Sequence, residues 1–130
     1  MPYEEINFRR TVDPLTGVVL RYELNRKGRL SEGFVHFPSG CDGLVYVRVL
    51  ITSKKQYIKQ VCPIGDEYIA LDDANYPFHI DQPVEVGDLI FVEIYNHDAT
   101  YQHTISTIIT FEYPVKKIIR RVIRTASNRG

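Results

Sequence analysis

The chain has 130 residues, 44% of them apolar, which suits one globular domain with an ordinary core. No apolar run reaches the roughly 18 residues of a membrane-spanning helix, and the acidic start at residues 1–5 is unlike a secretory signal. We therefore expect a protein without a signal peptide or a transmembrane segment.

The formal net charge of zero combines an acidic body with a basic tail. Residues 1–114 contain ten Lys or Arg and sixteen Asp or Glu, a net charge of −6. Residues 115–130 contain six Lys or Arg and no acidic residue, a net charge of +6. Such segregation is typical of an interaction tail. The partner of the tail is its own acidic body, a neighbouring copy or another macromolecule.

Eight or nine strands are expected at intervals of about 8–12 residues, with no helix before residue 114. Residues 1–10 form either an arm or a first edge strand. The next strands are predicted over residues 18–24, 33–37, 44–52, 56–61, 67–71 and 76–80. Pro77 favours an edge or a bulge for the last of these, because proline cannot donate to a sheet ladder.

The clearest pattern lies between residues 83 and 113, where two apolar runs flank a polar connection at 97–102. In both runs the large apolar side chains alternate with other residues, as they do in a sheet with one buried face. The predicted buried faces are Ile90, Val92 and Ile94, and then Ile105, Thr107, Ile109, Phe111 and Tyr113. Val45, Val47, Val49 and Ile51 form a similar face, which predicts a central strand.

These patterns predict an all-β fold, an antiparallel sandwich of eight to nine strands that is jelly-roll-like. An immunoglobulin-like sandwich is the alternative, although its Cys-Trp-Cys core signature is missing. We expect the sandwich domain to cover residues 1–114, followed by a short basic amphipathic tail at 115–130.

The tail has a helical period and needs a surface to dock on. Its apolar residues Val115, Ile118, Ile119, Val122 and Ile123 fall on one side of a helix. A helix this short and this rich in β-branched residues is marginal alone in water. We expect it to bind other protein subunits. The predicted partner-binding residues are Lys116, Lys117, Ile119, Arg120, Arg121 and Arg124. A strand added to a partner's edge is an alternative, and nucleic acid or a membrane is less favoured.

Three residues around one connection, His97, Asp98 and His103, are compatible with a transition metal. Together with Asn96 and Thr104 they resemble the first copper-ligand region of cupredoxins. Since no Cys, His or Met follows His103, the resemblance lacks its remaining ligands, and we predict no metal site. We expect Asn96 and Asp98 instead to shape a turn through hydrogen bonds to the backbone, and His103 to be half-buried with its hydrogen bonds satisfied.

Catalytic motifs are missing from the sequence: it has no nucleophile elbow, phosphate loop or dinucleotide fingerprint. We therefore predict a non-enzyme without a cofactor. Cys41 and Cys62 are expected to be free, buried thiols. Tyr95 and Tyr101, at predicted strand ends, are candidate ligand-binding residues, because tyrosine is enriched at interfaces and stacks on sugars. The alternative is that they cap the core.

Short predicted strands separate two segments of the sequence, Phe37-Pro38-Ser39-Gly40-Cys41-Asp42-Gly43-Leu44-Val45 and Gly87-Asp88. Over residues 30–113 this arrangement of loop segments and short strands resembles small β-sandwich virion proteins. These are the capsid decoration, accessory and connector proteins of tailed phages and archaeal viruses. The resemblance implies a non-enzymatic viral structural protein, a homo-oligomer that grips neighbouring subunits, in the virion or the cytoplasm. A ligand-binding module, for example for carbohydrate, is the alternative, followed by a metal-binding protein.

Overall fold

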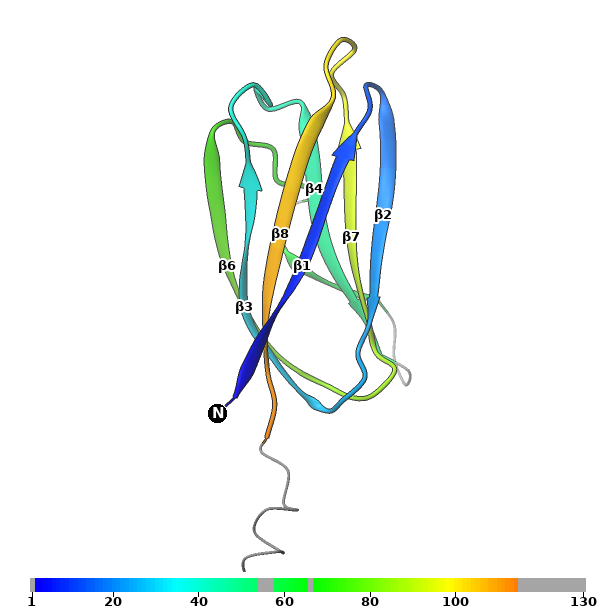
Figure 1. The fold of residues 1–130 in the computed structure, drawn as a ribbon, viewed down its shortest axis with the longest axis vertical. Coiled ribbons are helices and arrows are strands. Elements are labelled where there is room, and N and C mark those ends of the chain that lie inside the picture. Colours follow the sequence, from blue (N-terminus) through cyan, green and yellow to red (C-terminus); the bar gives the residue numbers. More distant parts are fainter. Residues whose placement is uncertain (1, 54–57, 66, 115–130) are drawn as a thin grey trace, which may run out of the picture.

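The computed structural model describes residues 2–53, 58–65 and 67–114, and these form a two-layer β-sandwich (Figure 1). Eight strands and no helix occur in these ranges, so the predicted all-β fold is confirmed. The strands are β1 (Tyr3–Val12), β2 (Thr16–Glu23), β3 (Gly28–Phe37), β4 (Val45–Thr52), β5 (Ile58–Cys62), β6 (Ala74–Val84), β7 (Leu89–Asn96) and β8 (His103–Glu112).

The strand order is that of a jelly roll. One sheet has the order β1-β8-β3-β6 and the other β2-β7-β4-β5, and every neighbouring pair is antiparallel. The pairs β1–β8, β2–β7, β3–β6 and β4–β5 show the chain as one long hairpin whose two arms pair in order. Wrapping that hairpin on itself produces the two packed sheets.

The core fills the space between the two sheets, as period-two patterning predicts. The inward faces of the central strands are almost fully buried: Val45, Val47, Val49 and Ile51 in β4, Ile90, Val92 and Ile94 in β7, and Ile105, Thr107, Ile109 and Phe111 in β8. All the buried faces predicted from these three segments are therefore confirmed. Tyr113, the last residue of the predicted β8 face, is partly buried and packs against the core.

The strand predicted over residues 67–71 is wrong. This segment makes only an isolated bridge between Ile69 and Val47, with N–H to carbonyl distances of 2.9 Å in both directions. It takes the place of β5 as the neighbour of β4 at Val47. β5 itself ends at Cys62, because Pro63 has no N–H to continue the ladder. The connection from β5 to β6 thus touches the sheet at one point and is otherwise irregular.

Two strands are longer than the sequence predicts. β3 begins at Gly28 rather than at residue 33. The sequence pattern misses its first residues because the register shifts between Leu30 and Glu32, which interrupts the alternation of buried residues. β6 extends from Ala74 to Val84 and lies at the edge of its sheet, which confirms the edge position that Pro77 predicts. β1 is the opposite edge strand of the same sheet.

The two ends of the sandwich differ. The connections at residues 13–15, 38–44 and 97–102 lie at one end, which we call the loop end (Figure 1). The start of β1 and the end of β8 lie at the other end, which we call the base, where the Tyr113 N–H donates to the Pro2 carbonyl over 3.1 Å. The tail, residues 115–130, falls outside the described residues, so its helical period stays a prediction. No helix suited to crossing a membrane occurs in the described ranges.

Candidate functional site

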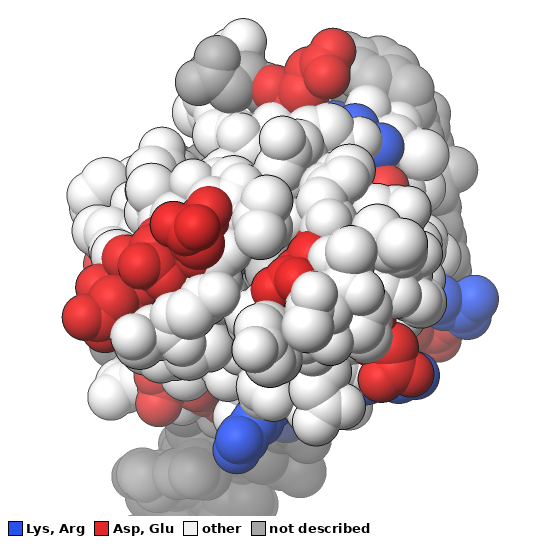
Figure 2. All heavy atoms as spheres, turned by 90° about the horizontal axis from the view of Figure 1, so that it is seen from above, with Lys and Arg blue, Asp and Glu red and all other residues white. Residues whose placement is uncertain are grey.

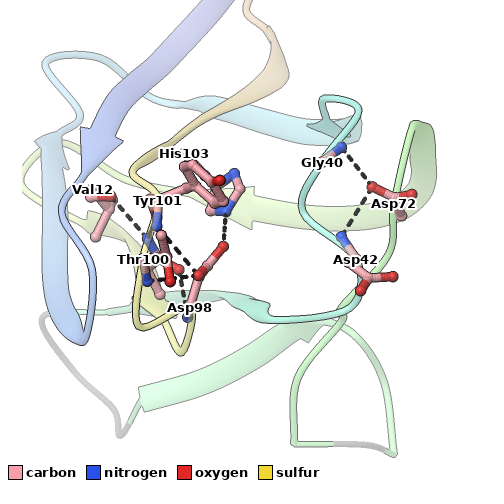
Figure 3. Close-up of polar contacts among 9 residues, drawn as sticks. Val12, Gly40, Asp42, Asp72, Asp98, Thr100, Tyr101 and His103 are labelled. Carbon is pink, nitrogen blue, oxygen red and sulfur yellow. Dashed lines mark hydrogen bonds and ion pairs between the residues drawn. The ribbon is translucent and has the colours of Figure 1, made fainter.

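The connection between β7 and β8 is built by side chains that bind its backbone (Figure 3). The buried Asn96 amide donates to the carbonyls of Val12 and Tyr101 at 3.0 Å, and its oxygen accepts the Asp98 N–H at 2.9 Å. One Asp98 carboxylate oxygen accepts the N–H groups of Thr100 at 2.8 Å and Tyr101 at 3.2 Å. The predicted turn-shaping role of Asn96 and Asp98 is confirmed.

His103 completes this turn. Its Nε2 lies 2.8 Å from the second Asp98 oxygen, and the two side chains are only 8% and 11% exposed. The hydrogen bond from His103, with those from Thr100 and Tyr101, lowers the pKa of the Asp98 carboxyl. His103 therefore makes the predicted kind of hydrogen bond, but it is buried and not half-buried as the sequence predicts. Its role is to hold the turn, and Asp98 is its partner.

The three residues weighed as metal ligands do not converge. His97 points to the outer surface and packs on Tyr46 and Tyr95, whereas Asp98 and His103 bind each other. Within residues 2–53, 58–65 and 67–114, no group of three or more His, Cys, Asp or Glu is placed to hold a metal ion.

A second polar group fixes the β3–β4 connection beside His103 (Figure 3). One Asp72 carboxylate oxygen accepts the N–H groups of Gly40 and Asp42, each at 2.9 Å. Both bonds join the β5–β6 connection, which contains Asp72, to the backbone of the β3–β4 connection. The space-filling view onto the loop end shows mostly uncharged residues, with several acidic groups among them and basic groups mainly toward its rim (Figure 2). This distribution does not suit a phosphate backbone.

Both cysteines are free and buried, which confirms the prediction. Burial raises the pKa of the Cys62 thiol to about 12. Burial, and secondly the charge of Asp72, raises the pKa of Cys41 to about 11. Thiols with so little thiolate at neutral pH are poor nucleophiles.

Four rings line up on the outer face of the sheet β2-β7-β4-β5, and we call them the aromatic row: Tyr95, His97, Tyr46 and Tyr68. The ring centroids are 4.3 Å apart for Tyr95 and His97, 4.2 Å for His97 and Tyr46, and 5.4 Å for Tyr46 and Tyr68. The strands explain the arrangement, because Tyr46 and Tyr95 are cross-strand partners and their neighbours along each strand point into the core.

A charged pair flanks the row in the next cross-strand position. Arg48 donates to Glu93 over 3.0 Å, and its guanidinium lies 5.2 Å from the centre of the Tyr68 ring. The hydrogen bond to Glu93 raises the pKa of Arg48 above its ordinary value. A shallow groove of about 150 Å³ runs between Tyr68, Glu93 and Tyr95 on one side and Gly17 and Val19 on the other.

The two predicted ligand-binding tyrosines lie apart. Tyr95 belongs to the aromatic row, whereas Tyr101 is 68% exposed in the β7–β8 connection. The sequence pattern does not predict Tyr46, Tyr68 or the role of His97 in this row. Alternation does place Tyr46 and Tyr95 on outward faces, but only the pairing of β4 with β7 shows that these faces adjoin.

A groove of the opposite character lies on the outer face of the other sheet, near the base. It has a volume of about 430 Å³ and is lined by Tyr3, Glu5, Glu32, Thr110 and Glu112. Glu5 and Glu32 both pair with Thr110 in register, so carboxylates from β1, β3 and β8 share one surface, which we call the acidic groove. No ion pair neutralises these three carboxylates within the described residues, since Arg29 pairs with Asp81 at 2.7 Å.

The six predicted partner-binding residues of the tail lie outside the described residues. The structure shows where the tail must begin: β8 ends at Glu112, which itself lines the acidic groove. The basic segment is therefore attached at the acidic end of this sheet face.

No family model matches the chain, and no curated protein matches it. Solved structures do share its fold. The mitogen of Yersinia pseudotuberculosis has a TM-score of 0.53 at 13% identity, over 87% of this chain and 90% of that one. The SPBc2 prophage-derived protein YomS has a TM-score of 0.50 at 10% identity, over 85% of this chain and 96% of that one.

The VP2 subviral particle of infectious bursal disease virus is also similar, with a TM-score of 0.49 at 12% identity. The match covers 86% of this chain and 32% of that one. The likenesses to the mitogen and to YomS show a common β-sandwich fold alone, and function must be argued from the surfaces of this chain.

Proposed function

We propose that the protein is a non-enzymatic structural component of a virion, a capsid decoration or accessory protein that forms a homo-oligomer through its basic tail. The observation that carries this proposal is the acidic groove at the base, beside the point where a segment of charge +6 begins. The jelly roll is a frequent fold of viral capsid domains, and a prophage-derived protein of similar span shares the sandwich.

A neighbouring copy is the occupant that the geometry favours for the tail. β8 runs toward the base, so a tail that folds onto its own groove has to reverse its direction after Pro114, whereas a tail that reaches a neighbour does not. The sixteen residues from 115 to 130 can span at most about 55 Å when extended, which is ample to reach a neighbour. Exchanged tails of this kind link identical subunits by one repeated contact.

The expected contact is electrostatic with an apolar component. Exposed ion pairs contribute only about 0.2–1 kcal/mol each, so Glu5, Glu32 and Glu112, for which no ion pair occurs among the described residues, must act together with apolar tail residues such as Ile119. Opposite net charges on body and tail also accelerate encounter between subunits.

A mixing experiment tests docking between copies. One chain carries Glu5→Lys and Glu32→Lys and keeps its tail; the other ends at residue 114 and keeps its groove. All eight strands lie within 3–112, so the shortened chain retains both sheets. Each chain alone is expected to be monomeric by light scattering, and their mixture is expected to form a complex. The matched control, Glu23→Lys with Glu85→Lys, makes the same charge change at exposed sites away from the groove and is expected to assemble normally.

Three results would contradict the proposal. The full chain could be a monomer at all concentrations, the chain ending at residue 114 could keep the full oligomeric mass, or the groove and control variants could assemble equally well. If the groove variant assembles normally while the chain ending at residue 114 does not, the tail docks on a different surface and the proposed contact is wrong.

A further inference from the structure

We propose that the aromatic row is a binding site for an uncharged saccharide. The row lies on the sheet opposite to the acidic groove, so this function is additional to the structural role and does not depend on it. The inference rests on the exposed ring faces, the charged pair beside them and the groove that both border.

The rings offer a partly exposed aromatic surface, in which neighbouring rings are tilted by 48–54° against one another. Tyr68 and Tyr95 are each 39% exposed, His97 is exposed, and Tyr46 is half-buried between its neighbours. The face of an aromatic ring is electronegative and attracts weakly positive C–H groups. A pyranose ring has such C–H groups on its faces, so it can lie on this surface without losing the hydration of its hydroxyl groups.

The same residues supply hydrogen bonds to the rim of a sugar. Every ring in the row carries a polar group, either a phenol hydroxyl or an imidazole nitrogen. Arg48 adds donors, and Glu93 adds an acceptor, beside Tyr68. Hydroxyl groups are both donors and acceptors, so they suit a guanidinium and a carboxylate that are held 3.0 Å apart.

The electrostatics favour an uncharged ligand. Arg48 is the cation of the site, and Glu93 already neutralises it. Phosphate backbones and acidic sugars require cations that are free to pair with them, and the residues that line the groove include no cation. Glu93 would also repel an anion in the groove.

The site is formed before any ligand binds. Gly17 lies opposite Tyr95 in the ladder, and a Cβ atom there would lie only 2.8 Å from the Tyr95 ring. The absence of a side chain on Gly17 therefore lets the Tyr95 ring pack over the backbone of β2. The Tyr95 hydroxyl also donates to the Leu15 carbonyl over 3.4 Å. Since Tyr46, Tyr95, Arg48 and Glu93 all project from paired strands, little ordering is needed on binding.

The dimensions fit one sugar unit of a chain. The groove of about 150 Å³ is smaller than the roughly 300–1,000 Å³ of enclosed small-molecule sites. An open groove beside a row of rings instead suits an extended oligosaccharide that places one unit in the groove and others along the row.

The test is a screen of the full chain on an array of uncharged oligosaccharides of glucose, galactose, mannose and N-acetylglucosamine. Calorimetric titration with each bound oligosaccharide follows. Tyr68→Ala and Tyr95→Ala are each expected to weaken binding about tenfold or more, because each removes a stacking face. Tyr101→Ala is the matched control, an exposed tyrosine outside the row, and is expected to bind as the native chain does.

A second pair of variants separates the contribution of the rings from that of their hydroxyl groups. Tyr68→Phe and Tyr95→Phe keep the rings and remove only hydroxyl groups, so they are expected to stay within a few-fold of native affinity. The absence of binding to every uncharged oligosaccharide would overturn the proposal, as would equal binding by the alanine variants and the native chain. If instead Tyr68→Ala and Tyr95→Ala reduce the oligomeric mass while no oligosaccharide binds, the row is a protein interface and the proposal is wrong.

Discussion

At the scale of single residues, the β7–β8 connection shows how much local chemistry a sequence reveals. Asn96, Asp98 and His103 lie within eight residues of one another, and their types alone predict a turn held by side chains. The structure confirms this turn, in which the Asp98 carboxylate binds His103 and two backbone N–H groups.

The first prediction concerns Asn96, whose side chain makes three hydrogen bonds in a fully buried position. Asn96→Ala leaves two carbonyls and one N–H without their partner, and is expected to lower the free energy of unfolding by about 1–3 kcal/mol. Urea denaturation measures the change. Asn7→Ala, on the exposed face of β1, is the control and should stay within about 0.5 kcal/mol of the native chain. Equal stability of both variants would contradict the structural role of Asn96.

The second prediction follows from the lowered pKa of Asp98. A carboxyl whose pKa is lower in the folded state stabilises the fold above its unfolded pKa of about 4, and this contribution disappears as the pH falls through the folded value. Asp98→Asn is therefore expected to be less stable than the native chain at pH 7, with the difference narrowing in acid. Denaturation at pH 7 and pH 3 measures this. Asp13→Asn, in the exposed β1–β2 connection, is the control, and a pH-independent effect of Asp98→Asn would oppose the prediction.

At the scale of elements, the strands with strict alternation could be predicted and the irregular ones could not. β4, β7 and β8 are buried on one face, and their inward residues agree with the sequence pattern. The pattern fails at β3, where the shift after Leu30 resets the period, and at residues 67–71, where Pro63 and the end of β5 leave room for a single bridge. Such features depend on neighbouring strands, which a local pattern does not contain.

The third prediction tests the close packing of β3 against both of its neighbours. A Cβ atom on Gly33 would lie 2.6 Å from the Ile108 carbonyl oxygen in β8 and 2.8 Å from the Phe78 ring in β6. Because the carbonyl belongs to a sheet ladder and cannot move freely, Gly33→Ala is expected to destabilise the protein by about 1–3 kcal/mol. Thermal unfolding measures it, with Ser31→Ala in the same strand as the control. A gain in stability would show that the strands separate easily.

At the scale of the whole molecule, two unlike outer faces share one core. One sheet carries an acidic groove near the base, and the other carries an aromatic row next to a neutralised charge pair. The sequence predicts the acidic body and the basic tail, because net charge needs no fold. It does not predict the row, since Tyr46, Tyr68 and Tyr95 are distant in sequence and meet only through the pairing of β4 with β7 and the bridge at Ile69.

The fourth prediction addresses the attraction between tail and body. The Debye length shortens from about 10 Å at 0.1 M salt to about 3 Å at 1 M, so contacts between exposed charges weaken. If several such contacts hold the oligomer, its dissociation constant is expected to rise at least about tenfold over this range. A variant with Gln at Lys116, Lys117, Arg120, Arg121 and Arg124 keeps the length of the tail and should be weakly associated at both salt concentrations. Sedimentation measures both. Association that strengthens with salt, or that survives the five Gln substitutions, would show that apolar contact rather than charge joins the subunits.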